Sequence, residues 1–416
     1  MQFSFLSVSR NIIATALIAT YLFPTAAEAK DAPVLPSPEV IAAIFKQGSE
    51  PAPTHAVKSP DNTTPDPLCR LAPADLTESR GAKIRTYKLL IEASDNDPQN
   101  PSKAFFRVHR FTVDADGSSR AYHPDDPLGV GVCVPGKSKA CALDEFSSAE
   151  IRLFRNNTEI DPHASEQEHD DFLATWSGLW AKISHKLITP LDHRSDPRIP
   201  NSYALYYFSD TNLTVVFNTA IIPFNNDAPC IRGPKLRDPG YFVAATSFTT
   251  RNVTPDNVCD PSLYIDASTV PFVVLPGGPF GKLAVGDIAV GYAQAETGDR
   301  LVYGIVGDTG PLQKLAEGSI AFNSKMIRRT KPLANSTEQG QIDINLSDTP
   351  ASRDHITAMS VLVLGGTMSA LKGDYSADHI AKIGNRLLNV WSGKRDPKAQ
   401  LADCMKIAPE NPWQVP

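Results

Sequence analysis

The sequence predicts an α+β fold that is mainly β, with a six-stranded β-barrel-like core and peripheral helices. Two observations lead to this prediction. About ten short apolar or β-branched runs are bounded by turn residues, whereas only two segments have convincing helical periodicity. The chain has 416 residues, 42% of them hydrophobic and 21% charged, so it is long enough for one large domain or two small ones.

The first 29 residues have the pattern of an export signal. Arg10 ends a short polar region, residues 12–22 are apolar, and Ala27-Glu28-Ala29 is a small-x-small cleavage site. The apolar segment is shorter than the roughly 18 residues needed to span a bilayer, and no other stretch reaches that length. We expect residues 1–29 to be a signal peptide. The mature chain is then secreted without a membrane span, or periplasmic in a Gram-negative bacterium.

Composition divides the mature chain into three parts. Residues 30–68 are rich in proline and poor in aromatic residues, which is typical of an extended linker. We expect a folded domain at residues 69–400 and a C-terminal tail at residues 401–416.

Local patterns predict the elements of this domain in chain order. Strands are predicted at 84–93, 104–113, 203–208, 213–224, 270–278, 284–291, 301–306 and 357–364. Residues 94–102 and 328–350 are polar and predict loops. Apolar residues at helical spacing predict two helices, at 165–187 and at 376–391. Acidic residues are concentrated in the first turns of the first helix, and Ser376 is a candidate N-cap of the second.

Six cysteines follow the predicted cleavage site, and an even number in an exported chain indicates disulfide bonds. The sequence does not fix their pairing. We expect Cys133–Cys141, Cys230–Cys259 and, by exclusion, Cys69–Cys404, which would join the two ends of the domain. No spacing of cysteine and histidine resembles a zinc site, and we expect no metal.

Charge and missing motifs narrow the class of function. The net charge of −6 argues against nucleic-acid binding, which usually needs a basic face, and suits a polycationic ligand. Residues 278–283 are glycine-rich but lack the spacing of a phosphate-binding loop. No Gly-x-Ser-x-Gly segment indicates a serine hydrolase. We expect no cofactor.

Two acidic residues flank a turn late in the chain. The apolar run 301–306 ends on Gly307-Asp308, a turn follows at 309–311, and Glu317-Gly318-Ser319 opens a second apolar run. This order predicts strand, loop, strand. It would hold two carboxyl groups across a small gap, which acid/base hydrolysis requires.

These residues resemble the signature of the chitosanases of glycoside hydrolase family 75. The resemblance is carried by Val302-Tyr303-Gly304-Ile305-Val306-Gly307-Asp308-Thr309-Gly310-Pro311 and by Ala316-Glu317-Gly318-Ser319-Ile320-Ala321. It implies that residues 69–400 form an inverting catalytic domain whose two essential acids are Asp308 and Glu317. We expect Glu317 to be the general acid and Asp308 the general base. The chain has Ala316 where the family usually has glycine, and the loop between the acids is short.

A second segment at residues 113–124 also resembles the family. A hairpin turn, in which Asp114 and Asp116 bond to the local backbone and Gly117 supplies a positive φ, would explain it equally well. A calcium loop is excluded because no glutamate follows at its last position. The resemblance implies a sugar-binding edge. There Tyr122 stacks on a pyranose and Asp114 and Asp116 bind ammonium groups. His123, which precedes Pro124, either assists proton transfer or has a structural role.

Three further residues are candidate substrate ligands. The resemblance implies a strand at residues 240–248 beside the cleft, in which Thr246 and Ser247 bond to substrate hydroxyls. Asp287 follows Gly286 and either binds a glucosamine ammonium group or caps a turn.

We therefore expect a secreted, monomeric endo-chitosanase that binds chitosan or a related glucosamine polysaccharide and no nucleic acid. The alternatives are a non-catalytic glycan-binding protein of the cell envelope, which Ala316 and the short loop would favour, and a hydrolase of another glucosamine polymer such as peptidoglycan.

Overall fold

A computed structural model describes the ranges 68–80, 83–94, 97–125, 151–161, 164–183, 187–188, 205–217, 221–225, 228–276, 282–310, 317–329, 344–346, 355–410 and 413–414. The chain divides into two units, Met1–Asp61 and Asn62–Pro416, and every described residue belongs to the second. The predicted signal peptide and almost all of the predicted linker lie outside the described residues. So do Cys133, Cys141 and the loop 311–316 with Ala316.

A mixed sheet of eleven strands forms the centre of the described fold. Its order is β1-β2-β3-β16-β12-β13-β11-β14-β4-β15, and β17 pairs with β2. The strands are β1 (Ala72–Arg80), β2 (Lys83–Ser94), β3 (Asp97–Val108), β4 (Arg110–Asp114), β11 (Phe272–Pro276), β12 (Ile288–Ala295), β13 (Arg300–Gly310), β14 (Glu317–Ser319), β15 (Ile344–Asn345), β16 (Ile356–Leu364) and β17 (Trp413–Gln414). The predicted α+β fold, mainly β, is confirmed, but the strand order does not close into a barrel among the described residues.

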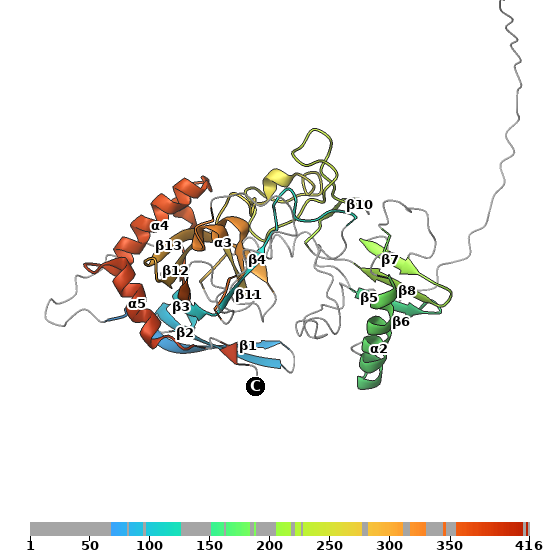
Figure 1. The fold of residues 1–416 in the computed structure, drawn as a ribbon, viewed down its shortest axis with the longest axis horizontal. Coiled ribbons are helices and arrows are strands. Elements are labelled where there is room, and N and C mark those ends of the chain that lie inside the picture. The colour runs from blue at the N-terminus through green and yellow to red at the C-terminus, as the bar shows by residue number, and fades with distance from the viewer. Residues whose placement is uncertain are drawn as a thin grey trace, which may run out of the picture. The chain divides into compact units, whose positions relative to one another are not determined.

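Both faces of this sheet are buried, as the near-continuous apolar runs of its central strands require. Alternate residues enter opposite cores: Val273 and Val306 belong to one, and Phe272 and Ile305 to the other. The first core also receives Phe322 of helix α3 (Ile320–Met326). The second receives helices α4 (Ala377–Ser392) and α5 (Pro397–Ile407), which lie together beside β12 and β13 in Figure 1.

A smaller sheet of four strands has the order β6-β5-β8-β7. Its strands are β5 (Ile151–Arg155), β6 (Thr158–Ile160), β7 (Tyr206–Ser209) and β8 (Leu213–Phe217), and β7 and β8 form the predicted hairpin. Helix α2 (Glu166–Ile183) matches the predicted helix and buries Phe172 and Trp176. The shorter elements are β9 (Phe224–Asn225), β10 (Ala228–Pro229) and the 3-10 helices η2 (Pro261–Leu263) and η4 (Met368–Leu371).

Two predicted strands are wrong in type. The apolar run after Glu317 is the three-residue strand β14 followed by helix α3, because the Ser319 hydroxyl caps the helix by accepting a hydrogen bond from the Phe322 N–H at 3.1 Å. Residues 240–248 form no strand. The N–H groups of Phe242, Val243 and Ala245 bond to the carbonyls of three separate segments, at Tyr122, Cys230 and Ile221, instead of to one neighbouring strand.

The predicted loop at 94–102 is also largely wrong, because β3 already begins at Asp97. The predicted strand 104–113 is interrupted at His109, where β3 ends and β4 begins. At this break the chain leaves β16, which pairs with β3, and β4 pairs with β14 instead.

The C-terminal residues belong to the fold, which corrects the tail predicted at 401–416. The boundary at residue 400 falls inside α5, where Leu401 and Met405 are buried in the second core. Trp413 then pairs with Tyr87 on β2. The folded domain therefore extends beyond residue 400, because the apolar face of α5 is part of its core.

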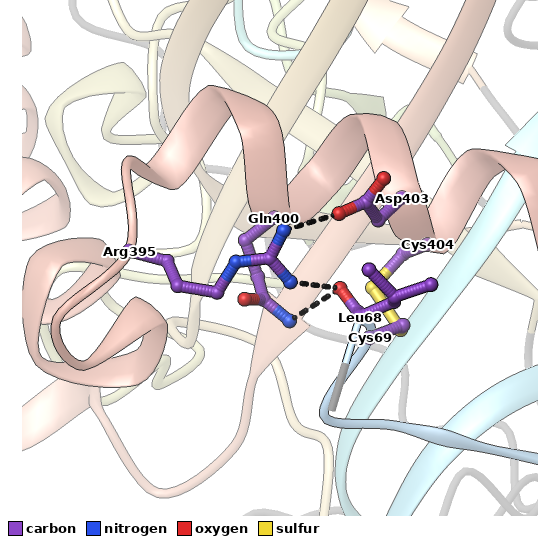
Figure 2. The surroundings of a disulfide bond; sticks show 6 residues. All are labelled: Leu68, Cys69, Arg395, Gln400, Asp403 and Cys404. Carbon is purple, nitrogen blue, oxygen red and sulfur yellow. Dashed lines mark hydrogen bonds and ion pairs between the residues drawn. A yellow bond between two sulfur atoms is a disulfide. The ribbon is translucent and has the colours of Figure 1, made fainter. Parts of the chain in front are cut away.

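Disulfide bonds join Cys69 to Cys404 and Cys230 to Cys259, which are two of the three pairs expected from the sequence. Figure 2 shows the first, at which polar side chains tie residue 68 to α5. The carbonyl of Leu68 accepts hydrogen bonds from Arg395 at 2.8 Å and Gln400 at 3.1 Å, and Arg395 also pairs with Asp403 at 2.5 Å. Within the described part of the chain, no helix is long and apolar enough to cross a membrane.

Candidate active site

Asp308 and Glu317 lie on either side of one residue of the main sheet. Val274 of β11 is in register with Asp308 of β13 on one side and with Glu317 of β14 on the other. Residues in register on neighbouring strands direct their side chains to the same face. Two strand spacings of about 4.8 Å place the two Cα atoms roughly 9–10 Å apart. The acids are thus separated by an inserted strand, and not by a hairpin.

A β-bulge brings Asp308 to this position. Val273 pairs with Val306, but Val274 pairs with Asp308, so Gly307 is the extra residue of the bulge. A Cβ atom on Gly307 would lie 2.4 Å from the ring of Phe272 and 2.6 Å from Ile265. Glycine is therefore required directly before the acid, because this backbone is pressed against the core.

The carboxyl group of Asp308 is buried, with 8% of the residue exposed, and its two oxygens differ. Oδ1 accepts hydrogen bonds from the backbone N–H of Ser247 at 3.1 Å, from the Ser247 hydroxyl and from the N–H of Thr309 at 2.6 Å. No hydrogen bond from the described residues reaches Oδ2. Burial raises the pKa of Asp308 to about 6, although the hydrogen bonds from Ser247 and Thr309 act in the opposite direction. Oδ2 is therefore the oxygen that can exchange a proton with a ligand.

Glu317 is half-buried and held by the elements on either side of it. The Thr112 hydroxyl of β4 donates to its Oε1 at 3.3 Å. The next two residues anchor β14. The hydroxyl of Ser319 accepts from the N–H of Phe272 at 3.0 Å and donates to the carbonyl of Val270 at 2.9 Å. A Cβ atom on Gly318 would lie 2.4 Å from the Asn323 amide oxygen. The Glu-Gly-Ser order therefore fixes the backbone that carries Glu317.

The segment 114–117 is a tight, buried turn at the end of β4. Oδ1 of Asp114 accepts the N–H of Asp116 at 2.8 Å, as in an Asx-turn. Gly117 has φ +76°, and a Cβ atom on it would lie only 1.8 Å from the carbonyl oxygen of Ile265. The structure thus contains the turn that the sequence analysis gives as the alternative explanation of this segment. The turn also carries Asp114 to the face that bears Glu317, because Asp114 is in register with Ser319.

Asp116 and Tyr122 form a buried pair in which the tyrosine hydroxyl donates to Asp116 Oδ1. Burial raises the pKa of Asp116 well above its usual value, and the charges of Asp114 and Asp308 act in the same direction. Burial and the same acidic neighbours also raise the pKa of Tyr122. The ring of Tyr122 is therefore enclosed and offers little surface on which a sugar could stack.

Asp114, Asp116 and Asp308 gather at one point. One carboxylate oxygen from each lies within 4.8 Å of the other two, a spacing at which oxygen atoms can hold a hard cation. We assign no ion to this group, because one oxygen of each carboxyl group already accepts a hydrogen bond, from the turn, from Tyr122 and from Ser247.

The side chains of Ser247 and Thr246 form hydrogen bonds with other groups of the protein. Ser247 bonds to Asp308 through both its N–H and its hydroxyl, and its hydroxyl is also 2.7 Å from that of Thr309. Thr246 is buried, and its hydroxyl donates to the carbonyl of Phe248 at 2.7 Å and accepts from the N–H of Ile265 at 3.3 Å. Ser247 thus holds Oδ1 of Asp308 in place, and the bonds of Thr246 shape the backbone beside it.

His123 and Asp287 are not brought to the acids by any contact of the described residues. His123 packs edge-on against Tyr241 at 4.7 Å between ring centroids and lies 3.6 Å from Asp125. Asp287 is 1% exposed, and its two oxygens accept the N–H groups of Ala284 at 2.9 Å and Thr367 at 2.8 Å. Burial raises the pKa of Asp287, and these bonds oppose the shift. The turn-capping alternative explains Asp287.

The sequence-based predictions miss one residue that contacts an acid of the site, and one that holds the segment directly after the turn 114–117. Thr112 contacts Glu317, and the period-2 pattern of 110–114 could have placed it on the same face as Asp114. Asp238 accepts from the Ser119 hydroxyl at 2.5 Å and from Arg120 at 2.7 Å, and these bonds lower its pKa. No local pattern marks Asp238, because its partners lie more than a hundred residues away.

Comparisons with known proteins identify no family, because no protein-family model matches the chain and a search of curated proteins finds no match.

Proposed function

We propose that this protein is an exported endo-acting chitosanase that hydrolyses β-1,4 glucosamine linkages with inversion. The observation that carries the proposal is the position of Asp308 and Glu317, on one face and two strands apart. Inverting hydrolysis needs two carboxyl groups roughly 6.5–9.5 Å apart, so that a water molecule fits between one of them and the sugar. Side chains leaning toward each other from Cα atoms roughly 9–10 Å apart can reach that separation.

The surroundings of the two acids favour Asp308 as the general acid and Glu317 as the general base, the reverse of the expectation above. A general acid must hold its proton near neutral pH, and burial raises the pKa of Asp308 to about 6. With Oδ1 occupied by three donors, the proton lies on Oδ2, from which it passes to the glycosidic oxygen. Glu317 is more exposed and can receive the proton of an attacking water.

The charge of the site suits a cationic sugar. Four acidic residues meet where the ends of β4, β13 and β14 approach one another: Asp114, Asp116, Asp308 and Glu317. A polymer of glucosamine carries ammonium groups that such a region attracts over a distance. The two disulfide bonds fit an exported protein, because they persist in oxidising compartments.

The barrel-like core is part of the same proposal. Strands β16, β12, β13, β11 and β4, with β14 between the last two, bury residues in one apolar core, to which Val361 of β16 and Phe111 of β4 both belong. Both acids are in register with Val274 of the second core, so closure of these six strands around the first core would place the acids on the outer face of the barrel.

The test is hydrolysis of chitosan by the wild-type protein and by Asp308→Asn and Glu317→Gln. We expect wild type to release reducing ends with inverted anomeric configuration, read by proton NMR, and both variants to lose this activity. Glu159→Gln is the matched control, because it neutralises an acid that pairs with Arg152 on the small sheet.

Other outcomes separate the alternatives. Full activity in both acid variants would refute the assignment of the site. Binding to insoluble chitosan without any release of product would identify a glycan-binding protein. Release of products from peptidoglycan in place of chitosan would identify a hydrolase of that other polymer.

A further inference from the structure

Asp116 is a buried carboxyl group that the proposed reaction does not use. It is 7% exposed, and its Oδ1 accepts the hydrogen bond of the Tyr122 hydroxyl. The charged groups that act on it come from every strand end around it: Asp114 from β4, Asp308 from β13 and Glu317 from β14. All three are acidic. A side chain so enclosed offers little surface to an ammonium group of the substrate. We therefore look for its role in its contacts with other residues of the protein.

We propose that Asp116 is a positioning residue whose carboxyl group stays protonated, is held by Tyr122 and orients the carboxyl group of Asp308 as a neutral hydrogen-bond donor. This inference rests on the proposed role of Asp308 in glycoside hydrolysis.

The spacing of the three carboxyl groups is the first argument. Asp114, Asp116 and Asp308 are each at most 9% exposed, and an oxygen of each lies within 4.8 Å of the others. Three carboxyl groups this close together in a buried place cannot all be ionised, so at least one of them must stay protonated. Asp114 accepts the N–H of Asp116, a bond that favours its carboxylate form. Burial favours the neutral form of Asp116, whose pKa is raised well above its usual value.

The available partners are the second argument. Oδ1 of Asp116 is an acceptor for Tyr122, so the proton of Asp116 lies on Oδ2. Asp308 has its Oδ1 occupied by Ser247 and Thr309 and presents Oδ2 without a bond from the described residues. A neutral donor beside Asp308 can set the orientation of that carboxyl group without adding another negative charge to the site.

The backbone holds Asp116 in this orientation. The N–H of Asp116 is tied to Asp114, and the N–H of Ser118 bonds to the carbonyl of Ala115 at 3.0 Å. Gly117 packs against the carbonyl of Ile265 so closely that no side chain fits. The backbone therefore fixes the carboxyl group of Asp116 within 4.8 Å of that of Asp308 before any ligand arrives.

Three variants test the proposal through the pH dependence of kcat/KM on chitosan. Asp116→Ala removes the donor and should lower kcat on the order of 10- to 100-fold through misplacement of Asp308. Asp116→Asn restores a neutral donor of the same shape, and should return kcat to within about threefold of wild type with the alkaline limb at the wild-type pH. Asp114→Asn removes a negative charge beside Asp308, and should move that limb to lower pH.

Two outcomes would overturn the proposal. If Asp116→Asn is as inactive as Asp116→Ala, or moves the alkaline limb as far as Asp114→Asn does, Asp116 works as a charged group. If a chelator lowers the melting temperature of wild type but not of Asp116→Asn, the three acids hold a cation.

A measurement without substrate separates this proposal from the proposed function. Infrared spectroscopy of wild type at pH 7 should show the carbonyl band of a protonated carboxyl group. The band should persist in Asp308→Asn, which removes the proton proposed on Asp308, and vanish when Asp116→Asn is added to that variant. Absence of the band in Asp308→Asn refutes the proposal even if the wild-type protein cleaves chitosan, and its presence there supports the proposal even if the wild-type protein does not.

Discussion

Asp308 and Asp287 are two buried aspartates at the same end of the sheet. They differ in how many of their carboxylate oxygens accept hydrogen bonds from the described residues. Asp287 precedes β12, and its own carbonyl accepts the N–H of Val306, two residues before Asp308. Both oxygens of its side chain accept backbone N–H groups. Asp308 has one occupied oxygen and one open oxygen. Burial raises the pKa of both, so burial alone does not distinguish an acid that reacts from an acid that holds turns together.

The largest expected effect is on turnover, and it should separate the two aspartates. Asp308→Asn should lower kcat on chitosan by about 10²- to 10⁴-fold, the usual contribution of general acid catalysis, while the protein stays folded. Asp287→Asn should leave kcat per folded molecule near the wild-type value. Initial rates divided by the folded fraction from circular dichroism give this comparison. Equal losses in both variants would remove the distinction.

The next effect is the pH dependence of stability. The pKa of Asp308 is about 6 in the folded protein and about 4 when unfolded, so the folded state binds the proton more tightly between those values. The free energy of unfolding of wild type should therefore fall as the pH rises from about 4 to about 6, by up to about 3 kcal/mol.

Asp308→Asn has no titrating group at this position, so its free energy of unfolding should not fall in that window. Its stability relative to wild type should therefore increase as the pH rises from about 4 to about 6. Urea denaturation at pH 4 and pH 7 measures the difference. Parallel pH profiles for the two proteins would contradict the raised pKa of Asp308.

A comparable or smaller effect is the stability lost at Asp287. In Asp287→Asn an amide NH₂ group replaces one acceptor and faces a backbone N–H that then has no partner. Removal of one buried partner of this kind typically costs about 1–3 kcal/mol. Urea denaturation at pH 7 should show this loss, and Asp260→Asn, at a more exposed turn, should show a smaller one.

The smallest effect should come from Ser247→Ala. The Ser247 hydroxyl lowers the pKa of Asp308, so its removal should move the alkaline limb of the kcat/KM profile upward, by about one pH unit. Thr246→Val is the matched control, because Thr246 makes no bond to Asp308 among the described residues. A limb that moves equally in both variants would show that the shift comes from the backbone.

Much of the sheet is predictable from local pattern. Ile288–Ala295 and Ile356–Leu364 are runs of apolar residues bounded by turns, and burial of both faces is what such runs require. The capped helix at 377–392 is predictable for the same reason, since Ser376 and the apolar residues of one face are local signals. The apolar run that follows Glu317 is not predictable in this way, because the bonds of Ser319 to Phe272 and Phe322 override the strand preference of that run.

The site is predictable only in part. Asp308 and Glu317 each mark the end of an apolar run, which is a local feature. That β11 lies between them is set by pairing of residues more than thirty positions apart, which no local pattern contains. The roles of Asp116, Ser247 and Asp287 depend on which oxygen atoms their neighbours occupy, and residue type alone does not reveal this.

The disulfide bond between Cys69 and Cys404 makes most of the described chain a covalent ring of 335 residue steps. A single cut by a protease anywhere within that ring opens it into one linear molecule and releases no fragment. The bond therefore keeps both sides of a nicked loop together, with every described strand of the sheet still attached. Limited proteolysis should show the cut only on a reducing gel, and two bands on a non-reducing gel would show that the ring is not closed.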